Sequence, residues 1–454
     1  MFFVLKSPSE MSTIHWLPPE DERFLGLEFY ATRASGLGGR IKREAADFRV
    51  EELSAYPRPD PNGPFTVLRV VSEGWEQHEL TDRLAQQLGI SAQTIRWAGT
   101  KDRRAVAQRI LSYRGPPPGS GTVHLPRVEI QDAYRSREEL VLGHHYGNRF
   151  ELRLRELDGP AEALMARAEG IRSEIVASNG FPNFFGAQRF GEVRPITHLV
   201  GRALVRGDVS GAVRIYLCEI PPGEVPLGAE ARRAYGQHDD PAQALREFPL
   251  PLQFERRLLD HLARGQSADR ALRALSRPLR TLFVHAYQAH LFNRYLSRRR
   301  AAGLSFSEPD PGDWLLRLAR DGTVPGRDPV PVSEDNLTEA RALVAQGKAR
   351  LAGPLVGYST PSLGGPGGEI FERILAEDGV ARDHFRLPKT PDLASAGNWR
   401  PFWCPAPAIE LGWEGPASDR ALRFAFNLPR GSYATVLLRE FTKRGAKREE
   451  GAPA

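Results

Sequence analysis

The segment IRWAGTKDRRAVAQRILSYRG, residues 95–115, carries an aspartate inside a basic turn and is the most informative stretch of the chain for its fold and function. A short apolar stretch leads into the turn at 99–104, and the residues after it are expected to continue as a helix. Asp102 stands in this turn between Lys101 and the pair Arg103 and Arg104. A carboxylate among cations stays ionised at neutral pH and can act as a nucleophile or a base. The alternative is an aspartate that caps the helix, with solvated arginines beside it.

Two more segments combine aromatic, polar and small residues. NGFPNFFGAQRFGE (179–192) holds four Phe, two Asn and three Gly. Aromatic rings beside amides and an arginine suit a pocket that stacks a base and hydrogen-bonds its edge. The alternative is a core loop with buried phenylalanines. LPRGSYATVLLREF (428–441) predicts a glycine turn, an aromatic residue and an amphipathic helix.

The surrounding elements indicate an α+β fold with mixed or antiparallel sheets. FTVLRVVSEG (65–74) predicts a strand, and ELTDRLAQQLGI (79–90) predicts an amphipathic helix that ends at Gly89. GNRFELRLREL (147–157) alternates between apolar and polar residues, which is typical of a half-buried strand. The motifs G-x-G-x-x-G and G-x-x-x-x-G-K-[ST] do not occur, so dinucleotide and NTPase functions lose their main support.

Composition limits the class of protein. The 454 residues are long for one core, so two or three domains are expected. Lys and Arg exceed Asp and Glu by 62 − 56 = 6, which fits a nucleic-acid partner without proving one. The two cysteines, Cys218 and Cys404, form no CxxC pair, which argues against structural zinc and disulfides. No signal peptide or membrane span is expected, and the protein is expected to be cytoplasmic.

Seven segments together resemble the TruD-type tRNA pseudouridine synthases, in order from about residue 40 to residue 443. AGTKDRRAVAQR resembles the family signature, and NFFGAQRFG resembles its second motif. The other five segments are IKREAADFRVEE (41–52), GHHYGNRF (143–150), HAYQAHLFNRYL (285–296), AGPLVGY (352–358) and LPRGSYATVLLRE (428–440). Any one of these segments is weak evidence, whereas seven in sequence order are specific.

The resemblance implies a pseudouridine-synthase catalytic domain, an α+β fold with a central mixed, mostly antiparallel sheet, interrupted by an inserted α+β TRUD domain. The expected divisions are 1–207 and 391–443 for the catalytic domain, 208–390 for the insertion and 444–454 for a disordered basic tail. The implied reaction is the isomerisation of a tRNA uridine, uridine 13 of the D-arm, by an intramolecular transferase. Neither a cofactor nor a metal is implied. The expected partner is tRNA, with other structured RNA left open and no obligatory protein partner.

The resemblance also assigns site residues by motif position. Asp102 matches the catalytic aspartate of the signature. The implied substrate-binding residues are Phe48, Asn183, Phe185 and Tyr433, and the implied supporting or phosphate-contacting residues are Lys42, Lys101 and Arg104. Aromatic rings can offset the cost of flipping a nucleotide out of its stack. The amide of Asn183 can read the edge of uracil or position Asp102.

Two rival functions and one rival binding site stay open. A glycosidase-like hydrolase needs a second carboxylate to activate water, and Glu51 and Glu52 are the nearby candidates in sequence. A non-catalytic RNA-binding protein would share the basic charge and the aromatics but would not need Asp102. The arginines at 298–300 are either a solvated helix end or a contact to the tRNA backbone.

Overall fold

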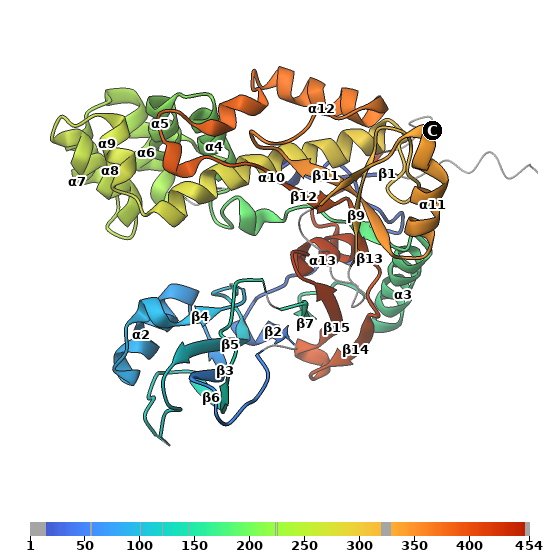
Figure 1. Ribbon diagram of the computed structural model, residues 1–454, viewed down its shortest axis with the longest axis horizontal. Helices are drawn as coiled ribbons and strands as arrows, with labels where there is room; N and C mark the ends of the chain where they lie inside the picture. Colours follow the sequence, from blue (N-terminus) through green and yellow to red (C-terminus); the bar gives the residue numbers. More distant parts are fainter. Residues whose placement is uncertain are drawn as a thin grey trace, which may run out of the picture. The chain divides into compact units, whose positions relative to one another are not determined.

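The structure is a computed structural model that describes residues 15–54, 57–99, 101–119, 121–143, 145–222, 224, 226–318 and 328–449. The chain divides into two compact units. Unit 1 comprises the residues up to Tyr30, Pro182–Trp403 and those from Gly445 onward, and unit 2 comprises Ala31–Phe181 and Cys404–Arg444. Figure 1 labels the elements of both. The sequence-based insertion at 208–390 falls within the long segment of unit 1, and its boundaries stay a prediction.

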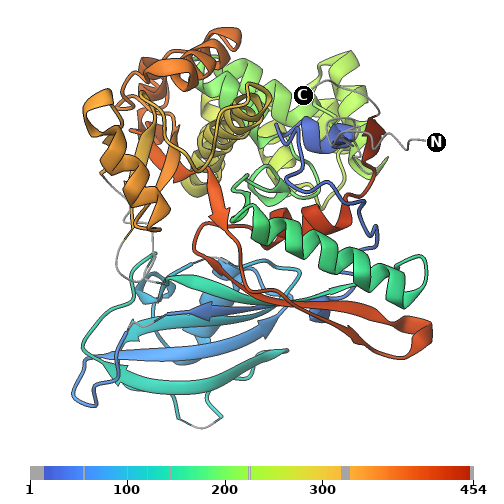
Figure 2. The ribbon, with the colours of Figure 1, turned by 90° about the vertical axis from the view of Figure 1, so that its right-hand side faces the viewer.

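Unit 2 is built on one eight-stranded sheet with the order β14-β15-β7-β2-β5-β3-β6, to which β4 adds beside β5. Its blue, cyan and red strands run side by side in Figure 2. Among these described strands β2 and β5 are parallel and the other pairs are antiparallel, which confirms the mixed, mostly antiparallel sheet. The strands are β2 (Phe48–Leu53), β3 (Phe65–Glu73), β4 (Arg96–Trp97), β5 (Val106–Arg114), β6 (Val128–Ser136), β7 (Gly147–Leu154), β14 (Glu410–Glu414) and β15 (Ala421–Pro429).

Apolar residues of helix and sheet form the core of unit 2. Leu80 and Leu84 of α2 (Gln77–Leu88) pack against Leu68 of β3 and Leu111 of β5. The helix ends at Gly89, whose φ of 66° is the left-handed conformation that glycine adopts without strain. The predicted strand, helix and helix end in this region are thereby confirmed. The remaining helices of unit 2 are α3 (Ala161–Ala177), α13 (Ala434–Thr442), η2 (Ala45–Asp47), η3 (Ala92–Thr94) and η8 (Ala417–Asp419).

The prediction of a helix after the basic turn is wrong, because these residues form strand β5. This strand lies between β2 and β3 in the middle of the sheet, and most of its residues are buried. A strand covered on both faces loses the simple apolar–polar alternation, so its sequence resembles that of a buried helix. Asp102 is consequently a residue of the β4–β5 loop and does not cap a helix.

Unit 1 is mainly helical around the long helix α10 (Arg277–Ala301), most of which is buried. Helices α4 and α12 pack against α10. A four-stranded sheet has the order β10-β9-β11-β12, and β1 pairs with β16. The other helices are α1 (Glu20–Arg23), η4 (Ala187–Arg189), α4 (Thr197–Val205), α5 (Val209–Cys218), α6 (Pro226–His238), α7 (Pro241–Glu247), α8 (Gln253–Ala263), α9 (Ala268–Arg273), η5 (Glu334–Asn336), α11 (Leu337–Ala345), α12 (Gly365–Glu377), η6 (Arg382–Arg386) and η7 (Pro391–Leu393). Its strands are β1 (His15–Leu17), β9 (Trp314–Arg317), β10 (Val330–Pro331), β11 (Ala349–Leu355), β12 (Asn398–Pro401) and β16 (Lys447–Glu449), while β8 (Gly180–Pro182) and β13 (Trp403–Pro405) contain unit boundaries.

The basic tail differs in part from the expected disorder. Residues 447–449 form β16, which pairs antiparallel with β1, and residues 450–454 lie outside the described part of the chain. Strand pairing uses backbone groups, so a charged sequence can take part in it. Within the described residues, none of the helices has the length and apolar character needed to cross a bilayer.

Candidate active site

Asp102 is held by Lys42, a residue 60 positions earlier in the chain. The Lys42 Nζ lies 2.7 Å from Asp102 Oδ2, and the two side chains are 5% and 21% exposed. Asp102 therefore has a fixed cationic partner and still reaches solvent. The Lys42 Nζ also lies 4.6 Å from the ring centroid of Phe48. The structure thus brings together three of the residues that the sequence selects for the site.

The backbone at Lys42 is strained. Its φ is 55°, a left-handed conformation that costs a non-glycine residue on the order of 1 kcal/mol or more. Such a conformation persists only where the surrounding structure enforces it. Lys42 is separated from Phe48 by the segment 43–47, which includes η2, so the contacts of this segment determine where both side chains lie.

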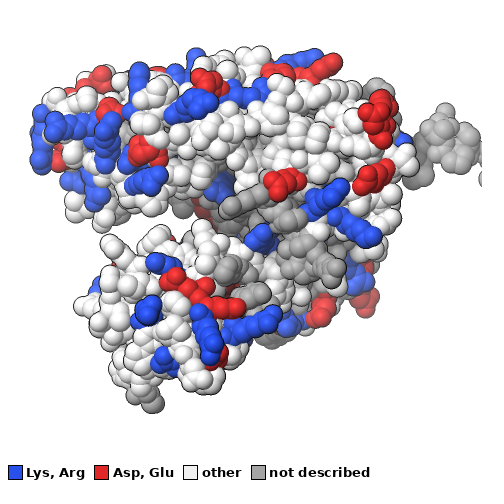
Figure 3. Space-filling model, in the orientation of Figure 1, with Lys and Arg blue, Asp and Glu red and all other residues white. Residues whose placement is uncertain are grey.

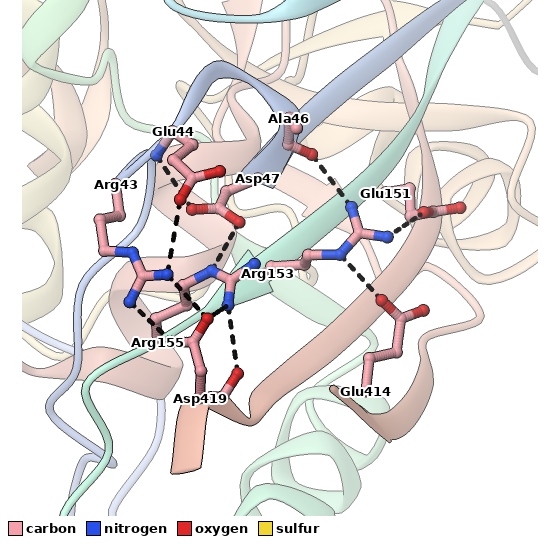
Figure 4. A network of polar contacts seen from close by, with 9 residues as sticks. All are labelled: Arg43, Glu44, Ala46, Asp47, Glu151, Arg153, Arg155, Glu414 and Asp419. Atoms are coloured by element: carbon pink, nitrogen blue, oxygen red, sulfur yellow. Dashed lines mark hydrogen bonds and ion pairs between the residues drawn. The ribbon is translucent and has the colours of Figure 1, made fainter. Parts of the chain in front are cut away.

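A network of ion pairs holds the segment 43–47 to the sheet and the β14–β15 connection (Figure 4). Arg43 makes a forked pair with Asp419, with distances of 2.8 and 3.0 Å. Asp47, which is buried, accepts from Arg155 Nε at 2.7 Å, and Arg155 also reaches Asp419 at 3.1 Å. Arg153 donates to the carbonyl of Ala46 at 3.0 Å. These contacts tie both ends of the segment down and so position Lys42 and Phe48.

A second ion pair fixes the other side of the Asp102 loop. Lys101 Nζ lies 2.7 Å from Glu52 Oε2, and the two side chains are only 4% and 1% exposed. Burial raises the pKa of Glu52, and Lys101 opposes this shift. Lys101 therefore points into unit 2, which suits a supporting role, whereas Arg104 is exposed. The sequence did not reveal Glu52 as the partner of Lys101, since the two are 49 residues apart.

This pairing removes Glu52, one of the two carboxylates named for the glycosidase alternative, as the group that activates water. A carboxylate that activates water needs access to that water. Glu52 is almost fully buried and is bound to Lys101. Its carboxylate is engaged in holding the loop.

Asn183 and Phe185 lie in unit 1, where Arg400 organises them. Arg400 Nη2 donates to Asn183 Oδ1 at 2.7 Å, and Asn183 Nδ2 donates to the Pro401 carbonyl at 3.0 Å. The Arg400 guanidinium lies 4.0 Å from the ring centroid of Phe185. The phenylalanine-rich segment has a packing role as well, because Phe181, Phe184 and Phe190 are fully buried. Arg400 was not singled out from the sequence, since its partners are more than 200 residues away.

Tyr433 is the N-cap residue of α13 and is half-buried in unit 2. It is more open than Phe48 and Phe185, which are each 4% exposed. The site residues inferred from the sequence thus fall into two sets. Asn183 and Phe185 belong to unit 1, and the other six, Lys42, Phe48, Lys101, Asp102, Arg104 and Tyr433, belong to unit 2.

No group of three or more His, Cys, Asp or Glu side chains in the described part of the chain is placed to hold a metal ion. His144, half of the His pair in GHHYGNRF, lies outside the described residues.

Comparison with known proteins gives one consistent family. Residues 24–441 match the family model described as tRNA pseudouridine synthase D (TruD). The chain belongs to the TruD family. It is 34% identical over 430 residues to the "Probable tRNA pseudouridine synthase D" of Methanosarcina mazei, which covers 94% of this chain and 98% of that protein. Its identity to the protein of the same name from Halobacterium salinarum is 37% over 437 residues, covering 93% and 97% of the two chains.

A solved structure supports the TruD fold. The crystal structure of the "Putative tRNA pseudouridine synthase D (TruD) from Methanosarcina mazei" superposes with a TM-score of 0.78 at 33% identity, over 94% of this chain and 98% of that one. Family membership supports tRNA pseudouridine synthase activity, an isomerase reaction in tRNA modification. The TruD resemblance inferred from seven sequence segments is confirmed.

Proposed function

We propose that this TruD-family chain isomerises uridine 13 in the D-arm of tRNA to pseudouridine and that Asp102 is the catalytic carboxylate. The observation that carries the proposal is the ion pair between Lys42 and Asp102, at 2.7 Å, in a loop where Asp102 keeps 21% of its side chain exposed. A cation at this distance holds the carboxylate in place through a charge-assisted hydrogen bond. The remaining exposure leaves the carboxylate group accessible from solvent.

The reaction breaks the bond between C1′ of the ribose and N1 of uracil and forms a bond between C1′ and C5. The ribose centre becomes electron-poor as the first bond breaks, and an ionised carboxylate stabilises it or attacks it. The freed uracil turns within the site and C5 joins C1′. The proton on C5 leaves to solvent and N1 takes up a proton, so that the product is an isomer of the substrate. Asp102 serves either as the nucleophile at the sugar or as a base, and Lys42 holds its carboxylate in place for either role.

The target nucleotide must leave the RNA stack to reach Asp102, which costs about a few kcal/mol. Of the three candidate aromatics, Tyr433 is the most open, so it is the proposed stacking platform. Phe48 and Phe185 would present only a small part of their rings. Asn183 would read the edge of uracil. Its amide can make up to four hydrogen bonds, two of which go to Arg400 and Pro401.

Exposed arginines support tRNA as the partner. In Figure 3, Lys and Arg side chains gather on the end of unit 1 that is built from α6–α9. Exposed members of this surface, which we call the helical basic face, are Arg233, Arg246, Arg257, Arg264, Arg270 and Arg273. Arginines bind phosphates through forked hydrogen bonds. This partner, and tRNA modification as the process, fit the cytoplasmic location that we propose.

Two of the three arginines at 298–300 are engaged within unit 1. Arg298 pairs with Glu377 at 2.6 Å, and Arg299 is buried against Asp313 at 2.7 Å. Both side chains are ion-paired within unit 1, so a solvated helix end does not describe Arg299, and Arg300 is the exposed member of the run.

The experiment that tests the proposed position is carbodiimide-based primer-extension mapping on a tRNA transcript. We expect a stop that reports pseudouridine at position 13 with the wild-type protein and none with Asp102→Asn. A transcript in which uridine 13 is replaced by cytidine is the matched substrate control. A stop at another uridine would overturn the position. Tight tRNA binding without any stop would favour a non-catalytic RNA-binding protein.

A further inference from the structure

The loop between β6 and β7 exposes apolar side chains. Among the described residues seven large apolar side chains are exposed, and three of them lie within residues 141–146. Leu142 is 71% exposed, Val141 51% and Tyr146 44%, directly after Leu140, which is fully buried. Single exposed apolar residues are common, whereas a cluster of them calls for a partner.

Hydrogen bonds hold this loop against the β4–β5 loop and two other segments of unit 2. The backbone N–H of Gly143 donates to the carbonyl of Ala98 at 2.7 Å, four residues before Asp102. The N–H of Tyr146 donates to the Leu53 carbonyl at 3.0 Å, next to the ion-paired Glu52. Arg430 donates to Tyr146 through its backbone at 3.1 Å and to the Gly143 carbonyl through its guanidinium.

The conformation of the loop is also specific. Gly143 has a φ of 90°, which side-chain-bearing residues rarely adopt. Hydrogen bonds to Ala98, Leu53 and Arg430 fix the backbone on either side of this turn. Val141 and Leu142 are therefore exposed to solvent from a backbone that is held in place. Their exposure therefore belongs to a built feature of unit 2 that adjoins the proposed catalytic loop.

The surroundings indicate which partner covers this apolar tip. Arg103 and Arg104 are exposed in the catalytic loop, and Arg430 anchors the tip from the other side. An apolar tip among arginines complements a nucleic-acid helix, whose base stack is apolar and whose backbone is anionic. Flipping one nucleotide out of such a helix leaves a gap in the stack beside it.

We propose that Leu142, supported by Val141, is the wedge that enters the RNA base stack beside the target uridine and fills the gap left when that nucleotide is flipped. This inference rests on the proposed function and adds the residue whose contacts offset the free-energy cost of unstacking the target nucleotide. Nucleic-acid-binding proteins that kink or open a stack insert apolar side chains such as Leu, Ile and Phe between bases in the same manner.

The test compares Leu142→Ala with wild type in single-turnover assays on two tRNA transcripts. One is intact, and the other carries an abasic residue beside the target, so the target uridine is already unstacked. Val176→Ala is the matched control, because Val176 is 54% exposed on α3 of unit 2 and belongs to neither the proposed site nor the helical basic face. A 2-aminopurine placed next to the target reports unstacking by fluorescence, and Leu142→Met tests rescue by another flexible apolar side chain.

We expect Leu142→Ala to slow the reaction on the intact transcript about tenfold and to remove most of the 2-aminopurine signal. The loss should shrink to less than about threefold on the abasic transcript, with Val176→Ala and Leu142→Met near wild type. Wild-type rates for Leu142→Ala on the intact transcript would overturn the role of Leu142 as a wedge. A protein would then be the partner that covers this apolar tip. An equal loss on both transcripts would show that Leu142 acts through the loop fold, which also overturns that role. No pseudouridine with the wild type would remove the proposed function itself, and the wedge with it.

Discussion

The buried pair between Lys101 and Glu52 gives a prediction with a calculable size. The substitution Glu52→Gln removes one charge from a pair whose side chains are 4% and 1% exposed and whose charged atoms are 2.7 Å apart. Breaking a buried ion pair by removing one partner costs about 3–5 kcal/mol, because the other charge stays buried without compensation. Replacing both partners by uncharged groups is often close to neutral. The double variant Glu52→Gln/Lys101→Met should therefore recover most of the stability.

Hydrogen exchange measured by mass spectrometry on peptides from β2 and β5 is the appropriate assay, since a chain with two units does not unfold in one step. Exchange in these strands should accelerate about 150- to 5,000-fold in Glu52→Gln. The double variant should return to within about tenfold of wild type. An acceleration below about threefold in Glu52→Gln would refute the reasoning, because Lys101 would then tolerate the loss of its partner.

Three more predictions follow from the site and its surroundings. Asp47→Ala should lower kcat about tenfold or more with little change in KM, as measured by steady-state kinetics on a tRNA transcript. The substitution removes the ion pair with Arg155 that holds the segment positioning Lys42, and it leaves the RNA-binding surface intact. His145 has a pKa lowered to about 4 by burial and by Lys101, so the unfolded chain binds more protons between pH 6.5 and 4. The contribution of neutral His145 to the free energy of unfolding should be fully present above pH 6.5 and should be lost as the pH drops toward 4. In acid-denaturation curves, His145→Gln should therefore lose less stability over this pH range than the wild type. Replacing Arg264 and Arg270 of the helical basic face by Ala should make the dependence of log affinity on log salt shallower by roughly one to two, and an unchanged slope would exclude this face from the tRNA contact.

Much of the fold follows from local sequence patterns. The strand β3, the strand β7 and the helix α2 were all predicted, because alternation and helical periodicity are strong where one face of an element is buried. Strand β5 was missed because it is covered on both faces, which removes the periodic signal. The strand β16 was missed because backbone pairing leaves no apolar pattern in its short charged sequence.

The candidate site shows a similar limit. The motif positions place Asp102, Lys42 and Phe48 in the site, and the structure brings these three together. Residues that contact the site residues from distant positions in the chain could not be identified from the sequence. Glu52 reaches Lys101 across 49 residues, and Arg400 reaches Asn183 across 217. Such pairs form only when the sheet or the helical core is assembled, so a single sequence cannot reveal them.

The most direct test of the central claim is tritium release from a tRNA transcript labelled at C5 of its uridines. Wild type and Asp102→Asn are compared, with tRNA binding measured in parallel to show that both proteins are folded. The account predicts that the wild type releases tritium, since the C5 proton leaves when C5 joins C1′, and that Asp102→Asn binds tRNA without release above background. Equal release by both proteins would remove Asp102 from the mechanism, and release by neither would contradict pseudouridine synthase activity on this tRNA.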